Sequence, residues 1–188
     1  MSADALRRIA QTSPWFMAAL RAARELALPD WAVGAGAVRN LVWDHLHQYA
    51  SPSALADVDL AYFDANEAPG TEALHQQRLM RAHPALPWEV TNQALVHHGF
   101  EQHFGHAVAP LGSLDEAVAS WPETATAVAL RLEPDDRLTV IAPLGLDDLF
   151  AMCVRRNPVR VSVDTYRARV ASKRYRERWP RVQVLLDA

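Results

Sequence analysis

A short apolar run that stops at a glycine turn most constrains the fold of this chain. Trp31-Ala32-Val33 ends at Gly34, and Val38, Leu41 and Val42 then recur at the spacing of one helix face. Glycine lets the backbone turn tightly and brings unobstructed N–H groups to the start of the helix. The pattern predicts a strand, a tight turn and a helix.

A second strand carries two carboxylates. After the break at Ser51-Pro52-Ser53, Val58 and Leu60 alternate with Asp57 and Asp59, as they do in a strand with one buried face. Residues two apart in a strand point to the same face and lie about 6 to 7 Å apart. Asp57 and Asp59 are therefore expected side by side, as oxygen ligands for a divalent cation.

A third acid follows in another short strand. Glu89 stands between Trp88 and Val90, directly after Pro87. The apolar neighbours are expected to face the core, which turns Glu89 to the opposite side of the sheet. Three carboxylates on one face can hold two Mg²⁺ ions at about 3.5 to 4 Å from each other, the separation used for phosphoryl displacement.

The glycine turn supplies the phosphate half of such a site. Gly34 and Gly36 present backbone N–H groups at a helix N-terminus, and Arg39 in the first turn can add a bidentate phosphate contact. Each feature alone is common, because glycine turns often precede helices and an Asp-x-Asp pair is often a solvated strand end. Their order and spacing together predict a site for a triphosphate and two metal ions.

The other segments predict an α/β (α+β) fold in which helices flank a small mixed or antiparallel sheet. A capping box at Ser113 to Glu116 predicts a short helix, and an apolar i, i+3, i+4 pattern predicts another helix over 146–154 that includes Cys153 as a core residue. The remaining expected elements are helices over 14–29 and 70–82, a hairpin of strands 127–132 and 138–142, and one or two helices from 165 onward. The stretch 92–111 gives no clear pattern.

Length and composition point to one domain over residues 1–188. Half of the 188 residues are hydrophobic, enough for one core and few for two. The sequence has no uncharged apolar run of eighteen residues, and its first eleven residues do not resemble a signal peptide. The expected location is the cytoplasm, without a membrane partner.

The charge distribution is uneven. Ten basic residues and two acidic ones lie between Arg155 and Arg181, a local net charge of +8, so the remainder carries −11. This segment predicts either an anion-binding face or a solvated surface whose arginines pair with acids of the body. We expect C-terminal basic helices, about 159–188, to pack beside the cleft, with Lys173 as a phosphate contact. A small acceptor is favoured over nucleic acid, because no basic motif with interleaved aromatic residues is present.

The motifs resemble a known superfamily. An apolar run with a glycine turn, a helix, Asp-x-Asp on the next strand and a later carboxylate resemble the nucleotidyltransferase superfamily of DNA polymerase β. Residues 34–40, Gly-Ala-Gly-Ala-Val-Arg-Asn, are similar to the turn and helix of bacterial CCA-adding enzymes and poly(A) polymerases. Nearly the whole chain resembles a family of small bacterial nucleotidyltransferase-like proteins through residues 33–44, 57–64, 87–93, 121–126, 142–150 and 156–158.

The resemblance implies Mg²⁺-dependent transfer of a nucleoside monophosphate from an NTP to an acceptor hydroxyl or amine, with release of pyrophosphate. Asp57 and Asp59 match the metal-binding pair, and Glu89 matches the third acid that helps to activate the acceptor. Gly34 and Gly36 match the phosphate-binding turn. Ala35 departs from the pattern, because the superfamily has glycine or serine there.

Two other functions stay open from the sequence. A nucleotide-binding or protein-interaction module without turnover is favoured by Ala35 and disfavoured by the three acids, whose mutual repulsion a binding module does not need. A zinc hydrolase would rest on His97, His98, His103 and His106, which equally fit a polar loop at the rim of the site. The acceptor, the base of the NTP and the oligomeric state are not determined.

Overall fold

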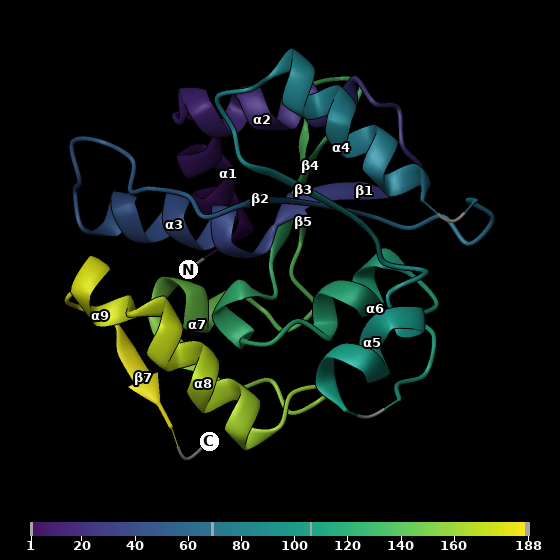
Figure 1. Cartoon of the computed structure of the whole chain (residues 1–188). Helices are drawn as coiled ribbons and strands as arrows, with labels where there is room; N and C mark the ends of the chain where they lie inside the picture. Colours follow the sequence, from purple (N-terminus) through teal and green to yellow (C-terminus); the bar gives the residue numbers. More distant parts are fainter. Residues whose placement is uncertain (1, 69, 106, 187–188) are drawn as a thin grey trace.

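The structure is a computed structural model that describes residues 2–68, 70–105 and 107–186. Its centre is a five-stranded sheet in the order β3-β2-β1-β4-β5 (Figure 1). The strands are β1 (Trp31–Gly34), β2 (Val58–Tyr62), β3 (Trp88–Asn92), β4 (Ala129–Leu132) and β5 (Leu138–Ile141). β2 and β3 pair in parallel and the other pairs are antiparallel, so the sheet is mixed and the expected fold class is confirmed.

Chain connections explain the mixed pairing. β2 and β3 are joined by the crossover helix α4 (Thr71–Ala82), as a parallel pair requires. β4 and β5 form the expected hairpin. Its turn is closed by a hydrogen bond in which the amide of Glu133 donates to the carbonyl oxygen of Arg137 at 2.9 Å.

One face of the sheet carries the main core. Helices α1 (Ala3–Gln11), α2 (Pro14–Arg24) and α4 lie on this side (Figure 1). Leu60, Trp88 and Val90 are buried in the same cluster as residues of these helices. The large apolar side chains of β2 and β3 therefore face the core as expected, which leaves Asp59 and Glu89 on the other side of the sheet.

The opposite face is only partly covered. Helix α6 (Leu114–Ala119) packs there, with Leu114 and Val118 against Ala61 and Ala129. The expected cap is present, because Ser113 Oγ accepts a hydrogen bond from the amide of Glu116 at 3.1 Å. Helix α8 (Val163–Lys173) lies further along this side (Figure 1).

The C-terminal segment is fixed to helix α3 (Ala35–Leu46) by aromatic residues. Trp43 packs edge-on against Tyr175 and Trp179, with ring centroids 5.8 and 5.3 Å apart. The indole of Trp179 donates to Asp44 at 2.7 Å. Strand β7 (Gln183–Leu185) pairs in parallel with β6 (Cys153–Arg155), and α9 (Tyr175–Arg178) lies between α8 and β7 in the sequence.

The prediction of a helix over 146–154 is wrong. Helix α7 spans only Asp147–Phe150; Met152 then has a φ of +55° and Cys153 begins β6. The apolar pattern could not reveal this, because the pairing partner β7 comes thirty residues later. Cys153 is buried as expected, although in a strand.

Two further helices occupy segments that the sequence left unassigned. They are α1 and α5 (His97–Phe104). A short 3-10 turn, η1 (Thr124–Thr126), precedes β4. None of the helices in the described ranges is long and apolar enough to cross a membrane.

Candidate active site

The strand register brings three predicted residues into one row. Asp59 on β2 pairs with Gly34 on β1 and with Glu89 on β3. Directly paired residues point to the same face of a sheet, so the Asp59 and Glu89 side chains are neighbours. The glycine turn therefore lies at one end of the row and the third acid at the other.

A cavity of about 240 Å³ opens over this row. Its lining includes seven of the eight predicted site residues, and Gly34, the eighth, is the N-cap of α3. These seven are Ala35, Gly36, Arg39, Asp57, Asp59, Glu89 and Lys173. The turn, the acids and the C-terminal lysine thus come together from four separate stretches of the chain.

The three acids share the cavity without closing on one point. Glu89 is exposed and Asp57 and Asp59 are half-buried. Among the described residues, no three His, Cys, Asp or Glu side chains lie close enough together to hold one metal ion. Like charges repel at short range, so unliganded carboxylates are expected to stand apart. Three carboxylates facing one cavity nevertheless suit Mg²⁺ chemically, because it prefers hard oxygen ligands.

Asp59 has an altered acidity. Burial, together with the charges of Asp57 and Glu89, raises its pKa from 3.8 to about 7. Arg169 and Lys173 oppose this rise. A cation bound beside Asp59 would offset the repulsion from its neighbours and stabilise the ionised carboxylate.

This pKa predicts a pH-dependent stability. Asp59 binds its proton more tightly in the folded chain than in the unfolded chain, so its contribution is full below pH 3.8 and is lost as the pH rises to about 7. After allowance for solvent screening, we expect a loss of about 2 kcal/mol. Denaturant unfolding from pH 4 to 8 should show this slope in the wild type and a flatter one in Asp59→Asn. Parallel profiles would contradict the assignment.

Gly34 is required by its contact with an aromatic ring. A Cβ atom at this position would lie 2.7 Å from the six-membered ring of Trp121 and 2.8 Å from the Cβ of Ala129. Trp121 itself lines the cavity. The glycine therefore allows an aromatic wall to approach the phosphate turn.

Replacing Gly34 should disturb both the turn and this wall. We expect Gly34→Ala to destabilise the chain by about 1 to 3 kcal/mol through overpacking. Gly112→Ala offers a control, since its Cβ would meet only the Glu116 carboxylate, at 3.1 Å. Urea unfolding of both variants compares the two effects, and equal stabilities would show that Trp121 moves aside without cost.

Ala35 begins α3 in an unusual conformation. Its φ is +49°, in the left-handed region that disfavours residues with a Cβ. Its amide donates to the carbonyl oxygen of Val128 at 3.1 Å. The amides of Gly36 and Ala37, in the first helical turn, have no acceptor within the helix. They are the groups that can meet a phosphate.

Arg39 is buried behind the turn. Only 3% of its surface is exposed, and its guanidinium lies 5.1 to 5.6 Å from the ring centroids of Trp43, Tyr175 and Trp179. One nitrogen donates to Asn40 at 2.8 Å, while Nε and Nη1 are buried without partners among the described residues. Its charge therefore lies beneath the turn and is matched by no carboxylate hydrogen bond there.

Comparison with known proteins agrees with this geometry. A family model described as nucleotidyltransferase matches residues 21–184. The chain belongs to this nucleotidyltransferase family. A search of curated proteins found no significant match.

Solved structures show the same fold. One, described as revealing a CCA-adding enzyme head domain, aligns with a TM-score of 0.84 and 29% identity over 98% of this chain and 96% of its own. A CCA-adding enzyme in complex with CTP aligns with a TM-score of 0.59 and 16% identity over 98% of this chain, and a tRNA-processing enzyme with 0.52 and 20% over 88%. This chain covers 43% and 42% of the latter two.

The second wall of the nucleotidyltransferase cleft comes from α8. Arg169 and Lys173 lie one helical turn apart and both line the cavity. Arg169 is held by Glu123, whose buried carboxylate accepts its Nε at 2.9 Å and the Tyr175 hydroxyl at 2.8 Å. Two residues of the basic C-terminal segment, Arg169 and Lys173, thus line the cleft.

Sequence reasoning missed several residues of the nucleotidyltransferase cleft. Trp121, Pro122, Thr91 and Gln93 line it but were not singled out as site residues. Arg169 appeared only as one of many basic residues. All four did stand in segments that carried the family resemblance, 87–93 and 121–126, which was the available signal.

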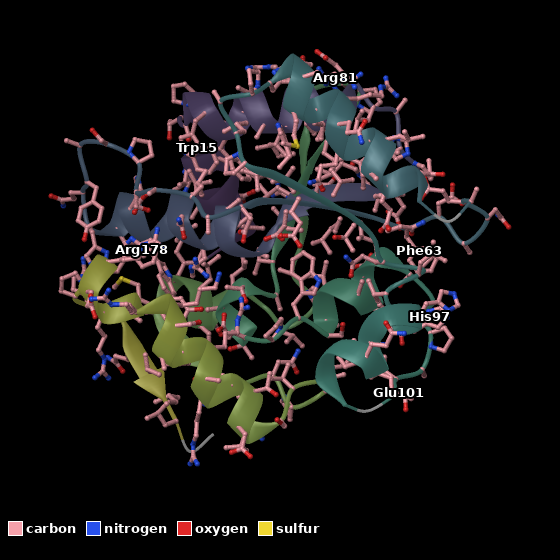
Figure 2. All side chains as sticks on the ribbon, in the orientation of Figure 1. Trp15, Phe63, Arg81, His97, Glu101 and Arg178 are labelled. Atoms are coloured by element: carbon pink, nitrogen blue, oxygen red, sulfur yellow. The ribbon has the colours of Figure 1, made fainter. Side chains whose placement is uncertain are left out.

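His97 and His98 do not line the cavity that the three acids share. His97 and His98 have ring centroids 3.9 Å apart, and Figure 2 shows His97 at the edge of the molecule on α5. The His103 side chain and His106 lie outside the described part of the structure. Within that part, no metal-binding group of three was found, so the zinc alternative gains no support.

Proposed function

We propose that this nucleotidyltransferase moves a nucleoside monophosphate from an NTP to an acceptor hydroxyl or amine and releases pyrophosphate. The row Gly34–Asp59–Glu89 carries the proposal, because it aligns a phosphate-binding turn, a metal-binding carboxylate and an acceptor-side acid across three adjacent strands. We further propose that residues 1–188 act as one domain, with α8 and α9 completing the cleft.

The turn and α8 would bind the leaving phosphates. The amides of Gly36 and Ala37 meet the phosphate oxygens at the N-terminus of α3, where the helix dipole also favours negative charge. Lys173 faces them from α8, and the buried charge of Arg39 lies beneath the turn. Cations on both sides favour the negative charge that develops on pyrophosphate.

Asp57, Asp59 and Glu89 would hold two Mg²⁺ ions. Bound there, Mg²⁺ supplies Lewis-acid activation of the acceptor and neutralises phosphate charge. The raised pKa of Asp59 favours its protonated form in the absence of a cation, and a bound cation would lower the pKa and favour the ionised form. Glu89, the most exposed of the three, is placed to receive the proton of the acceptor.

The nucleotide is proposed from charge and from likeness. A related CCA-adding enzyme structure contains CTP, which makes CTP and ATP the first nucleotides to examine. The transfer assay with each NTP, described below, would determine the base preference. A small acceptor is favoured over nucleic acid, because the cavity is small, about 240 Å³, and its basic residues Arg39, Arg169 and Lys173 are matched by three acids.

A transfer assay tests the function. The chain is incubated with Mg²⁺ and each α-labelled NTP, with panels of small-molecule, protein and RNA acceptors, and the label on the acceptor and the pyrophosphate are both measured. Label on an acceptor with stoichiometric pyrophosphate supports transfer. Tight NTP binding without either product over the whole panel would favour the binding module that Ala35 suggests.

Lys173 provides a test of the phosphate site. We expect Lys173→Ala to weaken Mg²⁺–NTP binding by about 1 to 2 kcal/mol, through loss of one charged hydrogen bond. Arg176→Ala is the control, since Arg176 is exposed on α9 and does not line the cavity. Calorimetric titration measures both. Unchanged NTP affinity in Lys173→Ala, with tight and steeply salt-dependent tRNA binding, would favour a nucleic acid role for the segment.

A further inference from the structure

A larger cavity lies beside the catalytic cleft. It encloses about 870 Å³ between β3, α5, the Trp121-Pro122 segment and α8. Glu89, Trp121 and Arg169 line both cavities, so the two adjoin. A molecule in the larger cavity can therefore reach Glu89.

The direction of the reaction assigns this cavity to the acceptor. In phosphoryl transfer the attacking and leaving atoms lie roughly in line with the phosphorus. The leaving pyrophosphate belongs at the turn of Gly36, at the β1 end of the row. The nucleophile must then approach from the β3 end, which is where the larger cavity opens.

The cavity walls specify a small and largely apolar molecule. Leu95, Val96, Phe100, Val161 and Ala168 form much of the lining. Its volume is in the range of about 300 to 1,000 Å³ that is usual for small-molecule sites. A polynucleotide would instead require an open groove with a continuous row of cations.

Charged residues on opposite walls of the cavity would orient a bound molecule. Glu72 and Glu89 lie on the α4 and β3 side, and Arg160 and Arg169 lie on the side of α8 and the loop before it. Arg169 is neutralised by Glu123. Arg160 donates to the carbonyl oxygen of Ala109 at 2.6 Å and lies over the Phe100 ring, with no carboxylate in hydrogen-bond contact among the described residues. It is a positioned cation that faces the cavity.

We propose that this cavity binds the acceptor, a small molecule with a flat apolar body, an anionic group toward Arg160 and the nucleophilic hydroxyl or amine toward Glu89. The assignment rests on the proposed transfer. The acceptor oxygen or nitrogen forms a bond to the α-phosphorus as the bond to the bridging oxygen breaks. Pyrophosphate leaves with that electron pair, and the acceptor proton passes to Glu89.

Two matched probes test the assignment without turnover. 3-(4-Hydroxyphenyl)propanoate and tyramine share a phenol and a two-carbon arm but carry opposite charges. Their binding is followed by amide chemical shifts of the ¹⁵N-labelled chain, and Mg²⁺–ATP binding is measured separately by calorimetry. We expect the acid to bind about tenfold more tightly than the amine and to shift residues of α8 and β3.

Three variants locate the site. Arg160→Gln should remove the preference for the acid. Ala168→Phe should fill the cavity and abolish acid binding, whereas Ala171→Phe, on the same helix but outside the lining, should not. Equal affinities of the two probes in the wild type, or absence of acid binding at the cavity, would overturn the proposal.

The nucleotide measurement separates this idea from the function on which it rests. Loss of Mg²⁺–ATP binding in Ala168→Phe, with acid binding retained, would mean that the cavity holds the nucleobase and would overturn the acceptor assignment. Failure of the wild type to bind Mg²⁺–ATP, while the probes behave as expected, would remove the transfer reaction and with it the acceptor role.

Discussion

Asp59→Asn is expected to lower nucleotidyl transfer at least about a thousandfold, as does loss of a central group in other catalytic units. Asp59 is the middle member of the row. The charges of both Asp57 and Glu89 act on it and raise its pKa. Asparagine keeps the shape and removes the charge, so the fold should persist. The rate of Mg²⁺-dependent pyrophosphate release measures the effect.

A matched substitution controls this result. Asp64 follows β2, and its side chain accepts a hydrogen bond from the amide of Asn66 at 2.9 Å, outside both cavities. Asp64→Asn should retain activity within about threefold of the wild type. Mg²⁺ with NTP should also raise the melting temperature more than NTP alone, and Asp59→Asn should lose that extra rise. Activity of Asp59→Asn within tenfold of the wild type would exclude the proposed metal site.

Glu123→Ala is expected to destabilise the chain by about 3 to 5 kcal/mol. The Glu123 side chain is 1% exposed and accepts hydrogen bonds from Arg169 and Tyr175. Its removal leaves the Tyr175 hydroxyl buried without that partner and an arginine without its counterion. Because Arg169 belongs to α8, the cleft wall should loosen as well. Denaturant unfolding measures the loss of stability.

Glu177→Ala is the control for this prediction. Glu177 also pairs with an arginine, Arg174, but both side chains are more than half exposed. Such a surface pair contributes at most about 1 kcal/mol. Glu123→Gln, which keeps the acceptor oxygen for Tyr175, should fall between the two. Equal stabilities for Glu123→Ala and Glu177→Ala would show that the Glu123 network does not hold α8 in place.

The part of the site that sequence predicted is the part encoded by local periodicity. Large apolar residues stand at every second position of β2 (Val58, Leu60, Tyr62) and at Trp88 and Val90 of β3. The faces of Asp59 and Glu89 could therefore be assigned before the pairing was known. The glycine turn was equally readable, because Gly34 interrupts an apolar run. The mixed sheet and its flanking helices followed from these signals.

The rest depends on contacts between distant residues. The pairing of Cys153 with Gln183 could not be read from an apolar pattern that suits a helix equally well. The contact of Trp121 with Gly34 joins residues 87 positions apart, and Glu123 meets Arg169 across 46. Arg39 was expected at the phosphates from its helical position alone, and its enclosure by three aromatic rings has no signal in the local sequence.

The pairing of β6 with β7 also orders the events of synthesis. Ribosomes deliver β1, β2, β3, the turn and all three acids by the time residue 92 has emerged. The pairing of β6 with β7, and the hydrogen bond from the Tyr166 hydroxyl of α8 to the carbonyl oxygen of Leu185, form only when residues 183–185 emerge. A nascent chain that ends before Gln183 thus carries the acids and α8 but lacks this last anchor of the wall that bears Lys173 and Arg169. The chain would then bind nucleotide fully only after its last segment has emerged. NTP would therefore not bind to the unfinished protein while its remaining segments are still folding.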